Sequence, residues 1–257
     1  MKRNEFARRT SADNASEGNL TMVKQEHMLE IVEVKMSSRI AGVSLIAAAS
    51  LFLVAWLLMP SPGVTDAQLI LMLVAPQRGA VAASVIVQLL STVLYIPAMT
   101  SVIGHSNPRL QTAVWWPASM FLVGVLGAVA DAIIHLLAYA MTAPNLDPGP
   151  LVVVMRFMQG PALLLITPLI IAFFIGGAWL SMALAREGIV SRRNPSLYAI
   201  ALGVGVLAAL LARVGGASPR TLGLVALGSV SAAQIWVGVA LWRLALAGLP
   251  ASASLSR

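Results

Sequence analysis

The chain has 257 residues, of which 58% are apolar and 11% are charged, against roughly 25% charged in a soluble domain. Thirteen of its 27 Lys, Arg, Asp and Glu residues precede position 40, so the remaining 218 residues carry only 14 charges. Because so few charges cannot solvate a soluble surface, the composition indicates a polytopic membrane protein. The absence of Cys excludes a disulfide scaffold, Cys-ligated zinc and iron–sulfur clusters.

The first 37 residues are polar and mixed in charge, which is typical of a disordered tail. The first long apolar run begins nearly forty residues into the chain, so no signal peptide is predicted. We expect a cytoplasmic tail over residues 1–37, a folded domain that starts near Met36, and a short cytoplasmic tail over residues 248–257.

Six apolar segments follow, each close to the ~20 residues needed to cross a bilayer. They are predicted at residues 40–59, 80–103, 113–141, 157–185, 197–212 and 222–246. The sequence therefore predicts an all-α, six-helix transmembrane bundle over residues 38–247. Residues 66–75 are too few to span, and Asp66 as an N-cap and Pro76 as a stop predict a helix on the outer membrane surface.

The distribution of Lys and Arg predicts the orientation of the helices. With the N-terminus inside, thirteen Lys and Arg residues lie on the cytoplasmic side and four on the other side. Positive residues accumulate in cytoplasmic loops, so both termini are predicted to be cytoplasmic.

Small residues four positions apart predict where helices approach closely. Such pairs occur on the last three predicted helices, at Ala172 and Gly176, Ala201 and Gly205, and Gly228 and Ala232.

Polar residues inside apolar runs are the candidate functional residues, because each is costly in hydrocarbon unless it is paired. Asp131 and His135 share one face of the third predicted helix, about 5 and about 10 Å outward of its centre. Gln88 is predicted at a depth similar to that of Asp131. A funnel-like cluster that opens to the outside is predicted from Asp131, His135, Gln88, Gln234, Arg156 and Gln159. The cluster is interpreted as a proton relay or a site for a small polar ligand; alternatively, Asp131 and His135 form a hydrogen bond that only stabilises packing.

Metal and cofactor sites are not predicted, and no catalytic residue is assigned. His105 and His135 differ in depth by roughly 25 Å, too far for two ligands of one haem, and one His with one Asp is an incomplete zinc site. Nucleotide-binding and hydrolase motifs are missing from the sequence. The net charge of +7 comes without a basic helix, so nucleic acid is not an expected partner. The expected partners are the bilayer and either another membrane protein or a second copy of the chain.

Short motifs also resemble those of a known group of proteins. Arg39-Ile-Ala-Gly42 opens the first helix, an outer insertion precedes the second, and Leu94-Tyr95-Ile-Pro97 lies late in the second. In this layout the chain is similar to an uncharacterised bacterial family of six-helix membrane proteins. The resemblance implies a multi-pass protein of the bacterial inner membrane and no established activity.

Three classes of function remain open. The sequence favours a non-enzymatic membrane scaffold or regulatory protein, which predicts mutually satisfied polar groups and no cavity. A small transporter or proton-coupled permease that uses Asp131 and His135 predicts a hydrated cavity that reaches Asp131. A membrane enzyme acting on a lipid or isoprenoid predicts a cleft open to lipid with at least two converging catalytic groups.

Overall fold

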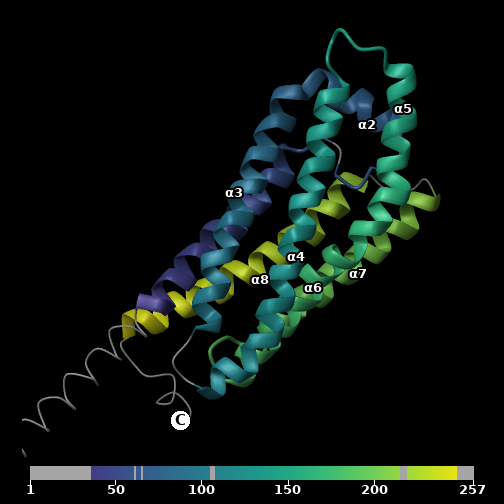
Figure 1. Ribbon diagram of the computed structural model, residues 1–257. Helices are drawn as coiled ribbons and strands as arrows, with labels where there is room; N and C mark the ends of the chain where they lie inside the picture. The colour runs from purple at the N-terminus through teal and green to yellow at the C-terminus, as the bar shows by residue number, and fades with distance from the viewer. Residues whose placement is uncertain (1–35, 61, 65, 105–107, 215–218, 248–257) are drawn as a thin grey trace, which may run out of the picture.

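The computed structural model describes residues 36–60, 62–64, 66–104, 108–214 and 219–247. Within these residues the chain is helical and contains no strand (Figure 1). The predictions for the tails, residues 1–35 and 248–257, fall outside the described part of the chain.

An N-terminal helix, Met36–Leu58, precedes seven further α-helices and two short helical turns of other types. These are, in chain order, α2 (Ala67–Val74), the 3₁₀ turn η1 (Ala75–Gln77), α3 (Arg78–Ile103), α4 (Pro108–Met141), α5 (Pro148–Phe157), the π turn η2 (Met158–Ala162), α6 (Leu163–Arg186), α7 (Asn194–Val214) and α8 (Pro219–Ala247). The prediction of an all-α chain is confirmed.

Five of the helical runs in the described residues are long and apolar enough to cross a membrane. They are Met36–Leu58, Ala67–Ile103, Arg109–Met141, Gly149–Arg186 and Arg220–Leu246; the apolar stretch described in α7, Asn194–Leu207, is shorter. Apolar residues also cover the outside of the bundle: Leu164, Leu165 and Leu202 are at least 70% exposed, whereas Gln88 and Gln234 are at most 3% exposed. Apolar surface around a polar interior is what a bilayer requires, so the chain is a membrane helix bundle.

The fourth predicted span begins nine residues earlier than expected, at residue 148 instead of 157. The Asp147 side chain caps the new start by accepting a hydrogen bond from Gly149 N at 3.0 Å, and Pro148 occupies the first helical turn. The π turn η2 then surrounds Pro161, which has no N–H to donate. At 38 residues the run Gly149–Arg186 is about 57 Å long, well beyond the thickness of hydrocarbon.

Residues 66–75 form the short helix α2 as predicted, but the predicted stop at Pro76 is wrong. Asp66 is the N-cap, and its Oδ1 accepts a hydrogen bond from Leu69 N at 2.7 Å. Pro76 lies in η1, which leads directly into α3. A proline is tolerated in a first turn, where its missing N–H is not needed. The apolar face of α2 is buried against α5 and the end of α4, and its position at the membrane surface stays a prediction.

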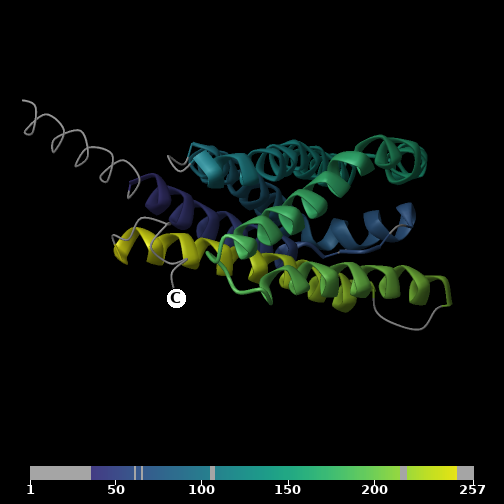
Figure 2. The same cartoon turned by 90° about the horizontal axis from the view of Figure 1, so that it is seen from below.

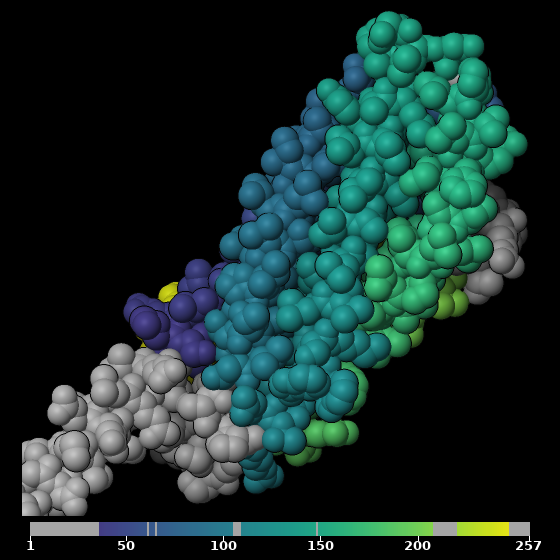
Figure 3. All heavy atoms as spheres, in the orientation of Figure 1, coloured from purple at the N-terminus to yellow at the C-terminus, as the bar shows by residue number. Residues whose placement is uncertain are grey.

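The helices form two layers joined by α6. Figure 2 shows α3 and α4 on one side of the bundle and α7 and α8 on the other, with α6 crossing obliquely between them. The N-terminal helix runs beside α8, where the chain-order colours purple and yellow meet. On the face seen in Figure 3, side chains of α3, α4 and α6 meet, so the gaps between the ribbons in Figure 1 are filled.

The contact between α4 and α6 depends on three glycines. A Cβ atom on Gly124 would overlap the backbone of Phe173, and one on Gly176 would overlap the backbone of Phe121. A Cβ on Gly127 would lie 2.8 Å from Ile170 N. The two helices therefore touch backbone to backbone, as small residues permit in membranes.

The other predicted small-residue contacts were wrong. Gly205 on α7 and Gly228 on α8 have open space where a Cβ would be added. A second close contact joins the N-terminal helix to α8, where a Cβ on Gly42 would lie 2.7 Å from Gly238 O. The spacing rule found Gly176 but missed Gly124, Gly42 and Gly238.

Gly124→Ala is expected to destabilise the protein, since the added methyl meets backbone, which cannot rotate away. Overpacking of this kind costs about 1–3 kcal/mol or more, in excess of the ~1 kcal/mol that Ala gains over Gly in a helix. The matched control is Gly205→Ala, for which we expect unchanged or slightly raised stability. Thermal unfolding of the purified variants in detergent measures both, and equal stability of the two variants would contradict the proposed contact.

Candidate functional site

A stripe of polar residues runs along the face of α3 that points into the bundle. Its members lie at positions i, i+4, i+7 and i+11, which places Ser84, Gln88, Ser91 and Tyr95 on one helical face. All four are at most 1% exposed. Ser84 Oγ donates to Ala55 O at 2.7 Å and Ser91 Oγ donates to Ala48 O at 2.8 Å. These two bonds hold α3 against the N-terminal helix and aim Gln88, which lies between them, at α4.

Gln88 is the hydrogen-bond partner of Asp131. Its Nε2 donates to Asp131 Oδ2 at 3.0 Å and to Ala128 O at 3.1 Å, so both amide hydrogens are used. The sequence predicted these two residues at a similar depth, and the structure brings them into contact. The Asp131 side chain is 18% exposed, whereas Gln88 is almost completely buried.

Asp131 differs from the other acidic residues of the described chain in its position. Between Met36 and Ala247 the sequence has four acidic residues. Asp66 and Asp147 cap the starts of α2 and α5, and Glu187 ends α6 and lies 3.8 Å from Arg109. Helix ends explain those three carboxylates, whereas Asp131 lies within the long helix α4.

His135 lies close to Asp131 without a hydrogen bond. Its Nδ1 is 3.8 Å from Asp131 Oδ2, which is too far for a hydrogen bond. The imidazole instead packs against the indole of Trp56, with ring centroids 5.5 Å apart and the planes nearly perpendicular. His135 Nδ1 and Trp56 Nε1 are both buried without a hydrogen-bond partner. Because such groups are costly to bury, this part of the bundle is not a fully satisfied polar network.

A cavity of about 200 Å³ reaches Asp131 from the centre of the bundle. It is lined by residues of the N-terminal helix, α3, α4, α6 and α8, namely Phe52, Trp56, Gln88, Gly124, Ala128, Asp131, Ile170, Phe173, Phe174 and Leu227. Four of these are aromatic, and Asp131 is the only charged one. Two of the aromatic rings are fixed by mutual contact, since the centroids of Phe52 and Phe173 are 5.4 Å apart.

The predicted funnel of six residues is not formed. Gln234 accepts a hydrogen bond from the Tyr95 hydroxyl and lies near Tyr198, in a separate buried cluster. Tyr95 is two turns along α3 from Gln88, and this distance separates the two clusters.

The two predicted members on the fourth span also lie away from Asp131. Arg156 is exposed on α5, next to the buried Met155, and Gln159 is half-buried in the π turn. Among the described residues, neither makes an ion pair or hydrogen bond with His135. The earlier start of α5 explains the difference, because it places Arg156 late in a helix that packs on α2.

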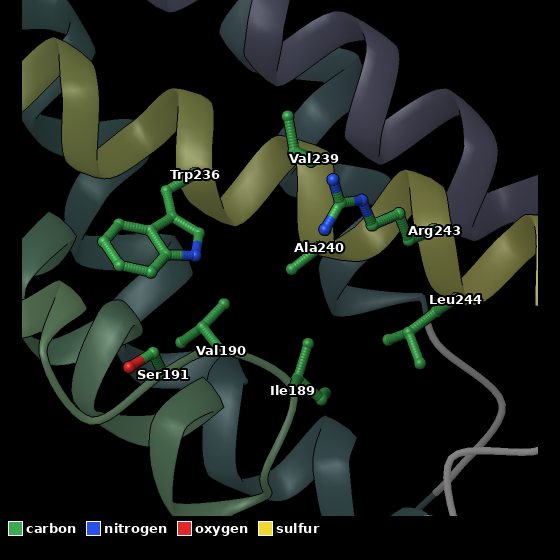
Figure 4. Close-up of a pocket in the computed structure, with 8 residues that line it drawn as sticks. All are labelled: Ile189, Val190, Ser191, Trp236, Val239, Ala240, Arg243 and Leu244. Carbon is green, nitrogen blue, oxygen red and sulfur yellow. The ribbon is translucent and has the colours of Figure 1, made fainter.

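A second cavity, of about 330 Å³, lies at the other end of the bundle between α8 and the chain that connects α6 to α7 (Figure 4). Its lining is Ile189, Val190, Ser191, Trp236, Val239, Ala240, Arg243 and Leu244. Arg243 is the only charged side chain among them, and Figure 4 shows it alongside α8, away from Ser191. Since no polar groups converge on this cavity, the Asp131 cavity is the stronger candidate site.

The described residues contain no group of three His, Asp or Glu side chains that could hold a metal ion. His105, considered above as a haem ligand, lies outside the described residues. The chain matches no protein-family model, and no curated protein and no solved structure is similar to it. The resemblance to the bacterial six-helix family stays a prediction, and the function must be argued from the site.

We expect Gln88, and not His135, to be energetically coupled to Asp131. A double-mutant cycle of Gln88→Leu and Asp131→Leu should give a coupling free energy of about 0.6 and at most about 1.7 kcal/mol, as for other hydrogen bonds within membranes. The matched cycle of His135→Leu and Asp131→Leu should give a value close to zero. Unfolding of the purified variants by detergent titration measures both, and a larger coupling for His135 would contradict the 3.8 Å separation as the relevant geometry.

Proposed function

We propose that the protein is a small membrane transporter of the permease type, with its ligand site in the Asp131 cavity. One observation carries the proposal: a cavity at the centre of the bundle reaches the single carboxylate that helix capping does not explain. A residue this costly in hydrocarbon is usually retained for an ion or substrate path. The cavity is lined from five helices, so a change in their packing would change access to it.

A scaffold or regulatory protein, which the sequence favoured, is less well supported by this geometry. Such a protein needs neither an internal cavity nor a carboxylate on its wall. It also predicts satisfied polar groups, whereas Trp56 Nε1 and His135 Nδ1 are buried without partners.

A membrane enzyme has the weakest support. Two acid–base groups would have to converge on one reacting bond. The second polar group in the cavity wall is Gln88, whose amide has no acid–base chemistry near neutral pH. His135 does not line the cavity.

Single-cysteine labelling tests water access to the cavity, because the native chain contains no Cys. Leu227→Cys places a thiol on the cavity wall contributed by α8. We expect water-soluble thiosulfonate reagents, one cationic and one anionic, to modify this thiol in reconstituted vesicles. The measurement is the rate of modification followed by mass spectrometry.

Val230→Cys is the matched control, since Val230 is on the same helix, is fully buried and does not line the cavity. It should remain unmodified. If neither reagent modifies Leu227→Cys, the cavity is closed to water and the transporter proposal is wrong.

We also propose that the protein lies in the bacterial inner membrane with the arginine-rich end in the cytoplasm. Ten Arg residues occur between Met36 and Ala247. Following the alternating direction of the helices, six lie at the end that holds the start of α4 and the α6–α7 connection, and four at the other end. The bias agrees with the positive-inside rule.

Labelling of exposed single cysteines tests this orientation. Ser191 lies in the α6–α7 connection and Leu146 in the α4–α5 connection, and both are exposed. In intact cells treated with an impermeant thiol reagent, Leu146→Cys should react and Ser191→Cys should react only after the membrane is made permeable. The reverse pattern would invert the topology, and equal labelling of both would contradict an odd number of spans between them.

A further inference from the structure

We infer that the ligand of the Asp131 cavity is a small organic cation that carries an ammonium or quaternary ammonium group. The inference rests on the proposed ligand-binding role of the cavity and specifies its chemistry. The argument combines the charge, the walls and the size of the cavity.

The charge of the site is incompletely balanced by the protein. Asp131 Oδ2 accepts one hydrogen bond from Gln88, and within the described residues Oδ1 accepts none. Arg and Lys side chains do not lie within 4.0 Å of the carboxylate in the described part of the chain, and His135 is the only ionisable neighbour. A carboxylate in a low-dielectric interior favours a positive partner, and the cavity is where such a partner can be placed.

The walls of the cavity suit the same kind of ligand. Phe52, Trp56, Phe173 and Phe174 contribute rings to the lining. The face of an aromatic ring attracts a cation, most strongly where water is excluded, and aromatic rings are the usual binding surface for quaternary ammonium groups. Ile170 and Leu227 supply apolar contacts for the alkyl substituents of such a group.

The volume of about 200 Å³ limits the ligand to a small one. A closed protein cavity of about 150 Å³ holds a benzene molecule, whereas drug-sized ligands occupy about 300–1,000 Å³. A trimethylammonium group with a short substituent is of suitable size.

Other ligand classes fit the site less well. An anion would be repelled by Asp131, and a neutral apolar ligand would leave the carboxylate without a partner. A bare metal ion requires several oxygen ligands, and the lining provides only the side chains of Asp131 and Gln88. A proton alone would need no aromatic walls.

Charge-selective labelling of Leu227→Cys tests the inference on the full-length protein in vesicles. The cationic probe is the trimethylammonium-ethyl thiosulfonate and the anionic probe is the sulfonato-ethyl thiosulfonate. Each rate is divided by the rate of the same reagent with 2-mercaptoethanol, which removes differences in intrinsic reactivity. We expect the normalised ratio to favour the cation by about tenfold or more, the change produced by one favourable ionic contact.

Two second-site variants separate the role of Asp131 from general effects of charge. Adding Asp131→Asn should bring the ratio close to one. Adding Asp147→Asn, which changes an exposed carboxylate outside the cavity in the same way, should leave the ratio unchanged. If the Asp131→Asn protein does not fold, Phe174→Leu replaces it and should lower the ratio by removing one aromatic wall.

The outcomes distinguish this inference from the proposed function. Equal normalised rates, or a preference for the anion, would overturn the cation inference while leaving a water-accessible transporter site. A cation preference that survives Asp131→Asn would also overturn it. Failure of both probes to react would overturn the proposed function itself.

Discussion

The backbone contact between α4 and α6 is the constraint on which the interior of this protein depends. Association of helices in lipid has little hydrophobic driving force, so close packing must supply it. Gly124 and Gly176 allow that packing because a side chain on either would overlap the facing backbone. The contact fixes the ring of Phe173 against α4, and Asp131 follows Gly124 by two helical turns on the same helix. The wall of the cavity and its carboxylate are thus positioned by one interhelical contact.

Hydrogen bonds across helices supply what glycine packing cannot, which is rotational position. A helix in lipid can turn about its axis at little cost when all its faces are apolar. Ser84 and Ser91 of α3 each donate to a carbonyl of the N-terminal helix, two turns apart, and so fix the rotation of α3. Gln88 then has one direction available, toward Asp131. The polar stripe is therefore both a support for packing and the device that orients the site.

The sequence predicted the helices well and their faces poorly, for a physical reason. Apolar runs of about 20 residues have one stable structure in a bilayer, so their positions are visible without a fold. The face that meets another helix is not visible, because lipid-facing and protein-facing residues are equally apolar; Gly205 has the same spacing signal as Gly176 and no neighbour. Polar residues carry the missing information. The contact between Gln88 and Asp131 could be anticipated from depth, and the spacing of Ser84, Gln88 and Ser91 would have shown the inner face of α3.

The π turn between α5 and α6 has a consequence for insertions and deletions in this chain. Met155 and Phe173 are 18 residues apart, so in an uninterrupted α-helix they would lie on the same face. A single π turn corresponds to one inserted residue and rotates the following face by about 100°. Met155 can therefore pack against α2 while Phe173 packs against α4. Loss of one residue from 158–162 would bring the two faces back into line, and the fourth span would then satisfy only one of the two cores it now joins.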